Sequence, residues 1–219
     1  MRLTLTLILA AAGPALPARG CDIALMLAID VSGSIDRGEY RLQTEGLAAG
    51  LADPEVAAAL AAGRALVAVV QWSSVGQQRM VLPWTRIAEP AEAARMAQEA
   101  AGLPRAFAFS DTAPGDFVAW AMPQFDGTGG CRRRVIDISG DGPINAGRPV
   151  TSQSIAAHRQ GIEINAIAIE EPGAGIPITE FYRRYVITPG GFVVTARGLA
   201  DYAPTLRMKL LREIVAPTG

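Results

Sequence analysis

Four continuous apolar segments constrain the fold of this chain more than any other feature of its sequence. Each is short, and none alternates apolar with polar residues, as a strand with one solvent-facing side would. Such segments are typical of strands in a parallel sheet whose two faces are both covered by helices. The four segments are residues 23–29, 65–70, 135–138 and 162–169.

Segments with helical character separate the apolar ones. They are residues 39–51, 90–102, 149–161 and about 198–214. Residues 77–85 are expected to form a short antiparallel strand at the sheet edge, because Pro83 would interrupt a central ladder. Strands that alternate with helices predict an α/β fold of the doubly wound class, with a mostly parallel sheet and helices on both faces.

The first twenty residues have the layout of a secretory signal peptide. Arg2 precedes an apolar run over residues 3–12, and small residues and prolines follow as far as Gly20. We therefore expect residues 1–20 to be removed and residues 21–219 to form a single domain, exported to the periplasm or the extracellular space. Lipid anchoring at Cys21 is the alternative, although Arg19 is unfavourable for the usual lipid-attachment signal.

The charge balance excludes two classes of partner. The chain has 20 basic and 21 acidic residues and a net charge of −1, so no basic field indicates nucleic acid or a membrane surface. After residue 20, no apolar segment is long enough to predict a transmembrane helix.

Oxygen-bearing side chains follow the first apolar segment in "AIDVSGSID". Asp30 ends this segment, Ser32 and Ser34 come next, and Asp141 in "IDISGDGPIN" ends a later one. In parallel sheets such strand ends meet at the crevice where the strand order reverses. Two carboxylates placed together repel unless a cation lies between them, and serine hydroxyls are ligands that Mg²⁺, Ca²⁺ and Mn²⁺ accept.

A plainer interpretation of the same residues exists. Serine, glycine and aspartate are ordinary turn formers after a strand, and Asp36 with Glu39 forms a capping box for the next helix. The residues alone leave both interpretations open.

At this point the sequence resembles a known family. An apolar strand, D-x-S-x-S and a later strand ending in D-G resemble von Willebrand factor type A (VWA) domains and integrin inserted domains, which hold a metal-ion-dependent adhesion site. "ALMLAIDVSGSID", "YRLQTEGLAAGLADPEV" and "RRRVIDISGDGPINAG" are similar to a secreted proteobacterial subfamily without an assigned function. The resemblance covers about residues 22–212. It implies a mostly parallel six-stranded sheet with one antiparallel edge strand.

The resemblance also implies a set of metal ligands. Asp30, Ser32 and Ser34 match the first metal loop, and Asp141 matches the last. The middle loop normally supplies a threonine after a glycine.

In this chain the middle loop is "FSDTAPGDFVAWA". It offers Thr112, with Pro114 suited to the first turn of the next helix. Asp111 replaces the glycine and is therefore an alternative ligand or a helix cap.

The implied cofactor is a divalent metal, Mg²⁺ foremost, with Mn²⁺ and Ca²⁺ as alternatives. The implied function is binding to a protein partner that donates a glutamate or aspartate carboxylate to the metal. A metal-dependent hydrolase and a purely structural domain with a degenerate metal site remain alternatives. An aspartyl-nucleophile phosphatase is disfavoured, because Ser32 stands where its second acid would be.

The two cysteines provide a check that does not use the metal motif. Cys21 lies nine residues before Asp30, and Cys131 lies ten before Asp141. If the two strands are parallel neighbours, both thiols lie at one level, which predicts a disulfide between them. Two unrelated thiols are the alternative, and acylation of Cys21 would exclude the bridge.

Overall fold

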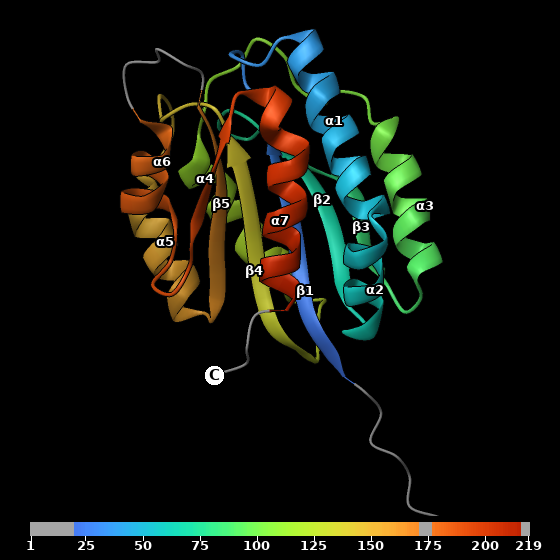
Figure 1. Cartoon of the computed structure of the whole chain (residues 1–219). Helices are drawn as coiled ribbons and strands as arrows, with labels where there is room; N and C mark the ends of the chain where they lie inside the picture. Colours follow the sequence, from blue (N-terminus) through green and yellow to red (C-terminus); the bar gives the residue numbers. More distant parts are fainter. Residues whose placement is uncertain (1–19, 171–176, 216–219) are drawn as a thin grey trace, which may run out of the picture.

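A six-stranded sheet lies at the centre of the computed structural model, which describes residues 20–170 and 177–215 (Figure 1). The expected signal peptide, except for Gly20, lies outside the described residues. The strands are β1 (Cys21–Asp30), β2 (Leu66–Trp72), β3 (Gln78–Arg86), β4 (Cys131–Gly140), β5 (Ile162–Glu170) and β6 (Val193–Arg197). Their order is β3-β2-β1-β4-β5-β6, and only the β2–β3 pair is antiparallel. The predicted fold class is confirmed, and the strand order reverses between β1 and β4.

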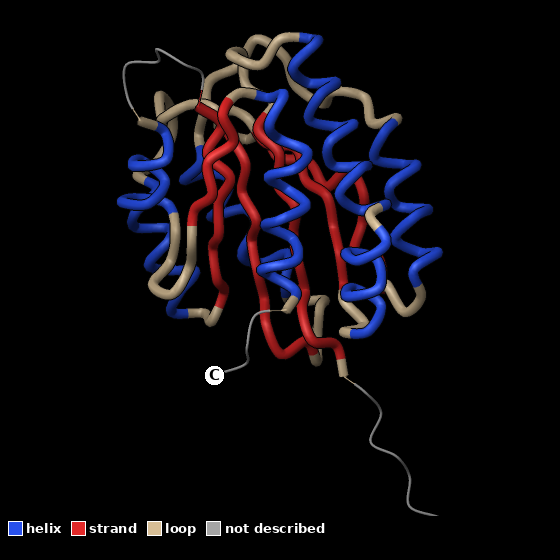
Figure 2. The backbone as a smooth tube through the Cα atoms, viewed as in Figure 1, coloured by secondary structure: helices blue, strands red, loops and turns tan. Residues whose placement is uncertain are grey.

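Helices cover both faces of the sheet (Figures 1 and 2). On one face lie α1 (Arg37–Ala52), α2 (Pro54–Ala62), α3 (Pro90–Ala101) and α7 (Tyr202–Ile214). On the other lie α4 (Pro114–Ala121), α5 (Val150–Arg159), α6 (Ile178–Phe181) and the π-helix Tyr182–Val186. Short 3₁₀ turns lie at Met122–Phe125 and Leu199–Asp201. No helix in the described part of the chain is long and apolar enough to cross a membrane.

β1 shows why its sequence is continuously apolar. Ile23, Leu25 and Leu27 pack into the core on the α1 side, whereas Ala24 and Met26 pack into the core on the α4 side. All are essentially buried, since successive side chains of a strand point to opposite faces and both faces are covered.

The edge strand β3 confirms the expectation drawn from Pro83. Pro83 is exposed, and the β2–β3 register shifts between the pairs Val67–Thr85 and Val69–Leu82, which flank it. A residue without an N–H is tolerated there because the ladder is already irregular at a sheet edge.

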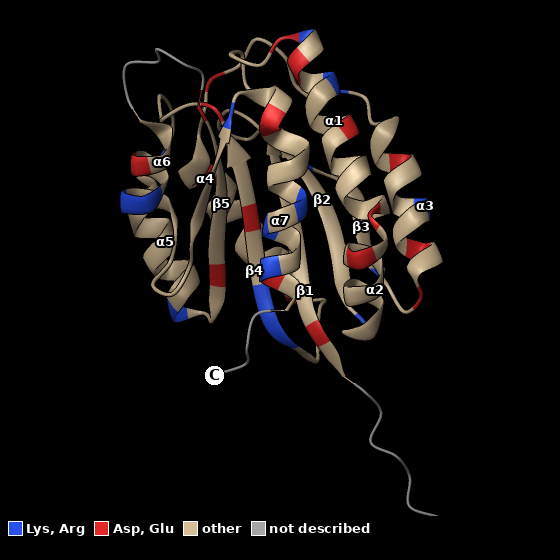
Figure 3. Cartoon of the chain, viewed as in Figure 1, with Lys and Arg blue, Asp and Glu red and all other residues tan. Residues whose placement is uncertain are grey.

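The predicted disulfide is present at the start of β1 and β4. Cys21 and Cys131 are paired in register across the two parallel strands, with Cα atoms 4.2 Å apart and a S–S bond of 2.06 Å. β4 begins four residues earlier than its apolar segment, because the basic stretch that starts at Cys131 also pairs with β1 (Figure 3). Within that stretch, Arg133 forms an ion pair with Glu163 of β5 at 3.1 Å.

The sequence did not indicate α2, α6, the π-helix or β6. β6 is short and mostly half-buried at the other sheet edge, so its apolar pattern is weak. The π-helix follows α6 directly and buries Tyr182 and Val186 in the core.

Candidate functional site

The loop after β1 brings three predicted site residues to the carboxyl edge of the sheet. Asp30 is the last residue of β1 and is completely buried, and the backbone N–H of Val31 still donates to Trp72 on β2 at 2.9 Å. The chain then turns: the N–H of Ser32 donates to Asp30 Oδ1 at 2.8 Å. This turn fixes the Asp30 carboxylate and directs the serine hydroxyls to the same side.

Hydrogen bonds join this loop to the end of β4. Ser32 Oγ and Ser34 Oγ are 3.3 Å apart, and Ser34 Oγ donates to Asp141 Oδ1 at 2.8 Å. Asp141 directly follows β4. Four of the five predicted metal residues are therefore linked in one chain of contacts, although 107 positions separate Ser34 from Asp141.

Thr112 lies against the same turn. It is buried, and a Cβ atom placed on Gly142 would lie 3.9 Å from the Thr112 hydroxyl. The neighbouring Asp111 is exposed, and its backbone carbonyl accepts a hydrogen bond from Ser73 Oγ. α4 begins at Pro114, as expected. Thr112 thus lies beside the turn that follows Asp141, and its role as the middle-loop ligand, with Asp111 as the alternative, stays a prediction.

Without a bound cation, the site disfavours the charged form of the Asp30 carboxyl group. Burial, and then the negative charge of Asp141, raise the pKa of Asp30 from 3.8 to about 7, although hydrogen bonds from Ser32 and the charge of Arg105 oppose the rise. Among the described residues, Asp30 Oδ2 is buried without a hydrogen-bond partner, and so is the Tyr182 hydroxyl. Burial and the charges of Asp30 and Asp141 also raise the pKa of Tyr182.

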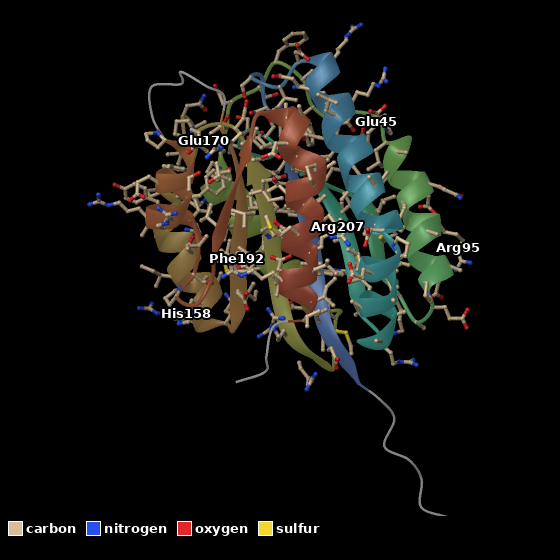
Figure 4. All side chains as sticks on the ribbon, viewed as in Figure 1. Glu45, Arg95, His158, Glu170, Phe192 and Arg207 are labelled. Atoms are coloured by element: carbon tan, nitrogen blue, oxygen red, sulfur yellow. A yellow bond between two sulfur atoms is a disulfide. The ribbon has the colours of Figure 1, made fainter. Side chains whose placement is uncertain are left out.

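This donor set fits a hard divalent cation. Two carboxylates and three hydroxyls converge on one strand edge, and a buried carboxylate oxygen has no partner within the described chain. In the described part of the chain, no cluster of three His, Cys, Asp or Glu side chains suited to a metal is present. The candidate ligands are therefore two carboxylates and three hydroxyls, without the histidine and cysteine that zinc usually takes. His158, the single histidine, lies exposed on α5 away from these strand ends (Figure 4).

Contacts that the sequence did not reveal hold the three loops together. Arg105 donates to the backbone carbonyls of Val31 and Ser32, at 2.9 Å and 2.6 Å. Asn145 Oδ1 accepts from the N–H of Thr112 at 2.7 Å, which ties the middle loop to the last.

An ion pair between exposed Arg148 and the nearly buried Asp116 adds a second tie, which joins the last loop to the first turn of α4. Arg148 donates to both carboxylate oxygens of Asp116, from its backbone N–H at 2.7 Å and from its Nε at 3.0 Å. An acid in the first turn of a helix already has a local explanation in the helix dipole, so no signal in the sequence pointed to this contact.

A second buried polar cluster lies under α7. Lys209 is fully buried and pairs with Asp137 of β4 at 2.6 Å and with Glu213 at 2.5 Å. Burial, followed by the charge of Asp137, raises the pKa of Glu213 to about 8. Leu206 and Leu210 of α7 are buried, but the charged neighbours on the same helix were not anticipated.

Comparisons with known proteins agree with this architecture. Proximal thread matrix protein 1 from the mussel byssus, in a structure with a zinc-occupied MIDAS motif, is 18% identical over 88% of this chain and 48% of that chain, with a TM-score of 0.65. A von Willebrand factor type A protein from Catenulispora acidiphila is 23% identical over 89% of this chain and 43% of its own, with a TM-score of 0.59. The pilus adhesin SpaC from Lactobacillus rhamnosus GG, in an open conformation, is 14% identical over 89% of this chain and 30% of its own, with a TM-score of 0.62.

These likenesses show a VWA-like fold, and this chain spans about half or less of the length of each of those three proteins. No curated protein matches the chain by sequence. One family model, described as "Protein of unknown function (DUF1194)", matches residues 20–218.

Proposed function

The chain belongs to the DUF1194 family and has a VWA-like fold, and from this premise we propose that it binds a protein partner through a divalent metal ion held at the carboxyl ends of β1 and β4. The observation that carries the proposal is the Asp30 carboxylate. It is fully buried beside a second acid, its Oδ2 has no partner among the described residues, and its pKa is raised to about 7. A bound cation would offset the repulsion between the two acids, give Oδ2 a partner and favour the charged form of Asp30.

Each residue has a defined part in this proposal. Asp30 and Asp141 supply negative charge, while Ser32, Ser34 and Thr112 supply neutral oxygens that leave some of the cation's charge uncompensated. A divalent cation held there provides a positive centre that a carboxylate from outside can approach. A glutamate or aspartate of a protein partner fits this chemistry. The zinc-occupied site of the mussel protein and the adhesin among the structural neighbours support the same conclusion by analogy.

Calorimetric titration of chelator-treated protein with Mg²⁺, Mn²⁺, Ca²⁺ and Zn²⁺ tests the metal. Wild type should bind at least one ion, whereas Asp30→Asn and Ser34→Ala should bind it weakly or not at all. Ser152→Ala is the matched control, because this exposed serine of α5 donates to the carbonyl of Pro149 and takes no part in the site. Absence of binding heat and of any rise in melting temperature with every ion would refute the proposal and favour a structural role.

The partner is tested by affinity capture from extracts with and without a chelator. Proteins retained by wild type in Mg²⁺, and lost both with chelator and with Asp30→Asn, would support metal-dependent protein binding. Phosphoester and peptide substrates are assayed in parallel. Turnover that Asp30→Ala abolishes would instead support the hydrolase alternative.

We also propose that the protein is exported. The disulfide between Cys21 and Cys131 supports this, because such bonds persist in oxidising compartments. The mass of the protein recovered from a periplasmic or culture fraction should correspond to a chain that begins near Cys21, without a lipid. A cytoplasmic protein that retains Met1 would contradict this proposal.

A further inference from the structure

We propose that a hollow beside the metal loop binds a large apolar side chain of the partner, placed within two residues of the carboxylate that reaches the metal. This inference rests on the function proposed above and names the kind of partner segment that the site selects. The hollow has a volume of about 530 Å³ and lies between the start of α1 and the loop 103–109. Its apolar lining consists of Ile35, Tyr40, Leu103, Pro104, Ala108 and Phe109.

The hollow directly adjoins the metal loop. Gly33, which also lines it, stands between Ser32 and Ser34 in the sequence. Alternate side chains of an extended peptide are about 7 Å apart. A residue one or two positions from a carboxylate at the site can therefore reach the hollow.

Phe109 is the unusual residue of this surface. Its side chain is 98% exposed, and its φ of +56° places a bulky residue in the left-handed region that glycine favours. The backbone conformation costs free energy, and the exposed ring recovers none by burial. Folding alone therefore gives no reason for a phenylalanine at this position, whereas binding to an apolar side chain does.

The loop that carries Phe109 is fixed to the metal loop. The N–H of Gly33 donates to the carbonyl of Ser110 at 2.7 Å, and a Cβ on Gly33 would lie only 3.1 Å from that same oxygen. Arg105 holds the other side of the loop through its bonds to Val31 and Ser32. These contacts fix the backbone that carries Phe109 relative to the metal loop, as a surface that recognises two neighbouring side chains requires.

The charges around the hollow favour an acidic segment. Arg37 and Arg105 both line it, and Arg37 is exposed. The one acid in the lining, Asp36, is engaged in the capping box of α1, where its Oδ1 accepts from the N–H of Glu39 at 2.8 Å. We therefore expect a partner segment with an aspartate or glutamate and a nearby Phe, Tyr, Trp or Leu.

Selection from a displayed peptide library tests this inference. Each peptide has one fixed glutamate and three randomised positions on either side, and selection is run in Mg²⁺ and in chelator. The baits are wild type, Phe109→Ala, Asp30→Asn and Met208→Ala. Met208 is the matched control, because it is 57% exposed on α7, outside the hollow. Melting temperatures confirm that every bait is folded, and light scattering detects association between copies of the chain.

Wild type and Met208→Ala should enrich peptides that carry a large apolar residue within two positions of the glutamate, in Mg²⁺ only. Phe109→Ala should bind such a peptide at least tenfold more weakly. Replacing the peptide's apolar residue with alanine should weaken wild type as much and should weaken Phe109→Ala little further, since both changes remove the same contact.

The two possible failures differ in their results. Enrichment that depends on Mg²⁺ and glutamate, without an apolar preference or without any effect of Phe109→Ala, would overturn this inference and leave the proposed function intact. Absence of enrichment in Mg²⁺ would overturn both. Mg²⁺-independent self-association that Phe109→Ala abolishes would show that the hollow pairs two copies of the chain, and would also overturn the inference.

Discussion

Replacing Asp30 with asparagine should stabilise the metal-free protein at neutral and alkaline pH. The folded pKa of Asp30 is about 7, compared with an ordinary value of 3.8, because its carboxylate is buried beside Asp141. The folded state therefore holds a proton that the unfolded state has already released, so stability falls as pH rises between these two values. At about 1.4 kcal/mol per pH unit, the full penalty above pH 7 is about 4 kcal/mol. It is absent below pH 4.

Urea denaturation in chelator at pH 5, 6, 7 and 8 measures this penalty. Fluorescence of Trp72 reports unfolding, since its ring is buried and stacks on Phe117 at 5.4 Å between centroids. The free energy of unfolding of Asp30→Asn, minus that of wild type, should grow by about 3 kcal/mol from pH 5 to pH 8. Groups that do not interact with Asp30, Glu213 among them, cancel in the difference.

Metal should narrow the difference in stability between the two proteins. At 100 times its dissociation constant, Mg²⁺ would stabilise wild type by about 2.7 kcal/mol and leave Asp30→Asn unchanged. If the difference between the two proteins in chelator were the same at pH 5 and pH 8, Asp30 would not carry a raised pKa. The electrostatic argument for the metal site would then fail.

Three further perturbations test other parts of the fold. Replacing Cys21 and Cys131 with serine should lower the free energy of unfolding by about 4–5 kcal/mol in the chain-entropy model, because the bridge spans 110 residues; an unchanged urea midpoint would contradict this. Gly140→Ala should lower the melting temperature and abolish the heat of Mg²⁺ binding, because its Cβ would collide with the Tyr182 hydroxyl. Adding Tyr182→Phe should restore part of the stability, and a fully stable single variant would disprove the close packing. Burial raises the pKa of Glu213 to about 8, so wild type loses stability as pH rises toward 8. The melting temperature of Glu213→Gln, relative to that of wild type, should therefore be higher at pH 8.5 than at pH 5, and a pH-independent difference would rule this out.

The sequence predicted the strands and the helix cap, which depend on local pattern, and the disulfide, which depends on how many residues separate each cysteine from the end of its strand. Each apolar segment lies almost entirely within a strand, and the structure has the capping box at Asp36 and Glu39 that the plainer interpretation expected. The two interpretations of that loop are compatible, since the helix cap begins where the serine turn ends. Counting residues back from the two acids correctly predicted the bridge between Cys21 and Cys131.

The sequence did not predict contacts that exist only after distant segments meet. Lys209 lies on the buried side of α7, which a rule based on apolar residues cannot anticipate, because its burial depends on Asp137 of a different element. Tyr182 is a second example, because nothing near it in the chain indicates that its hydroxyl lies beside Gly140 at the end of β4. The role of Arg105 also depends on a loop 73 residues away.

The register between β1 and β4 sets the geometry of the whole site. Cys21 pairs with Cys131 at one end of the two strands and Ile29 pairs with Ser139 at the other, so the next residue of β4, Gly140, lies beside Asp30. A Cβ at Gly140 would lie 3.0 Å from Asp30 Oδ2, so a larger residue would displace the carboxylate. A slip by one residue would reverse every β4 side chain between the two faces of the sheet and move Asp141 from its contact with Ser34. The disulfide and the acids are therefore parts of one arrangement, because the bridge fixes the alignment that brings both carboxylates to the same level.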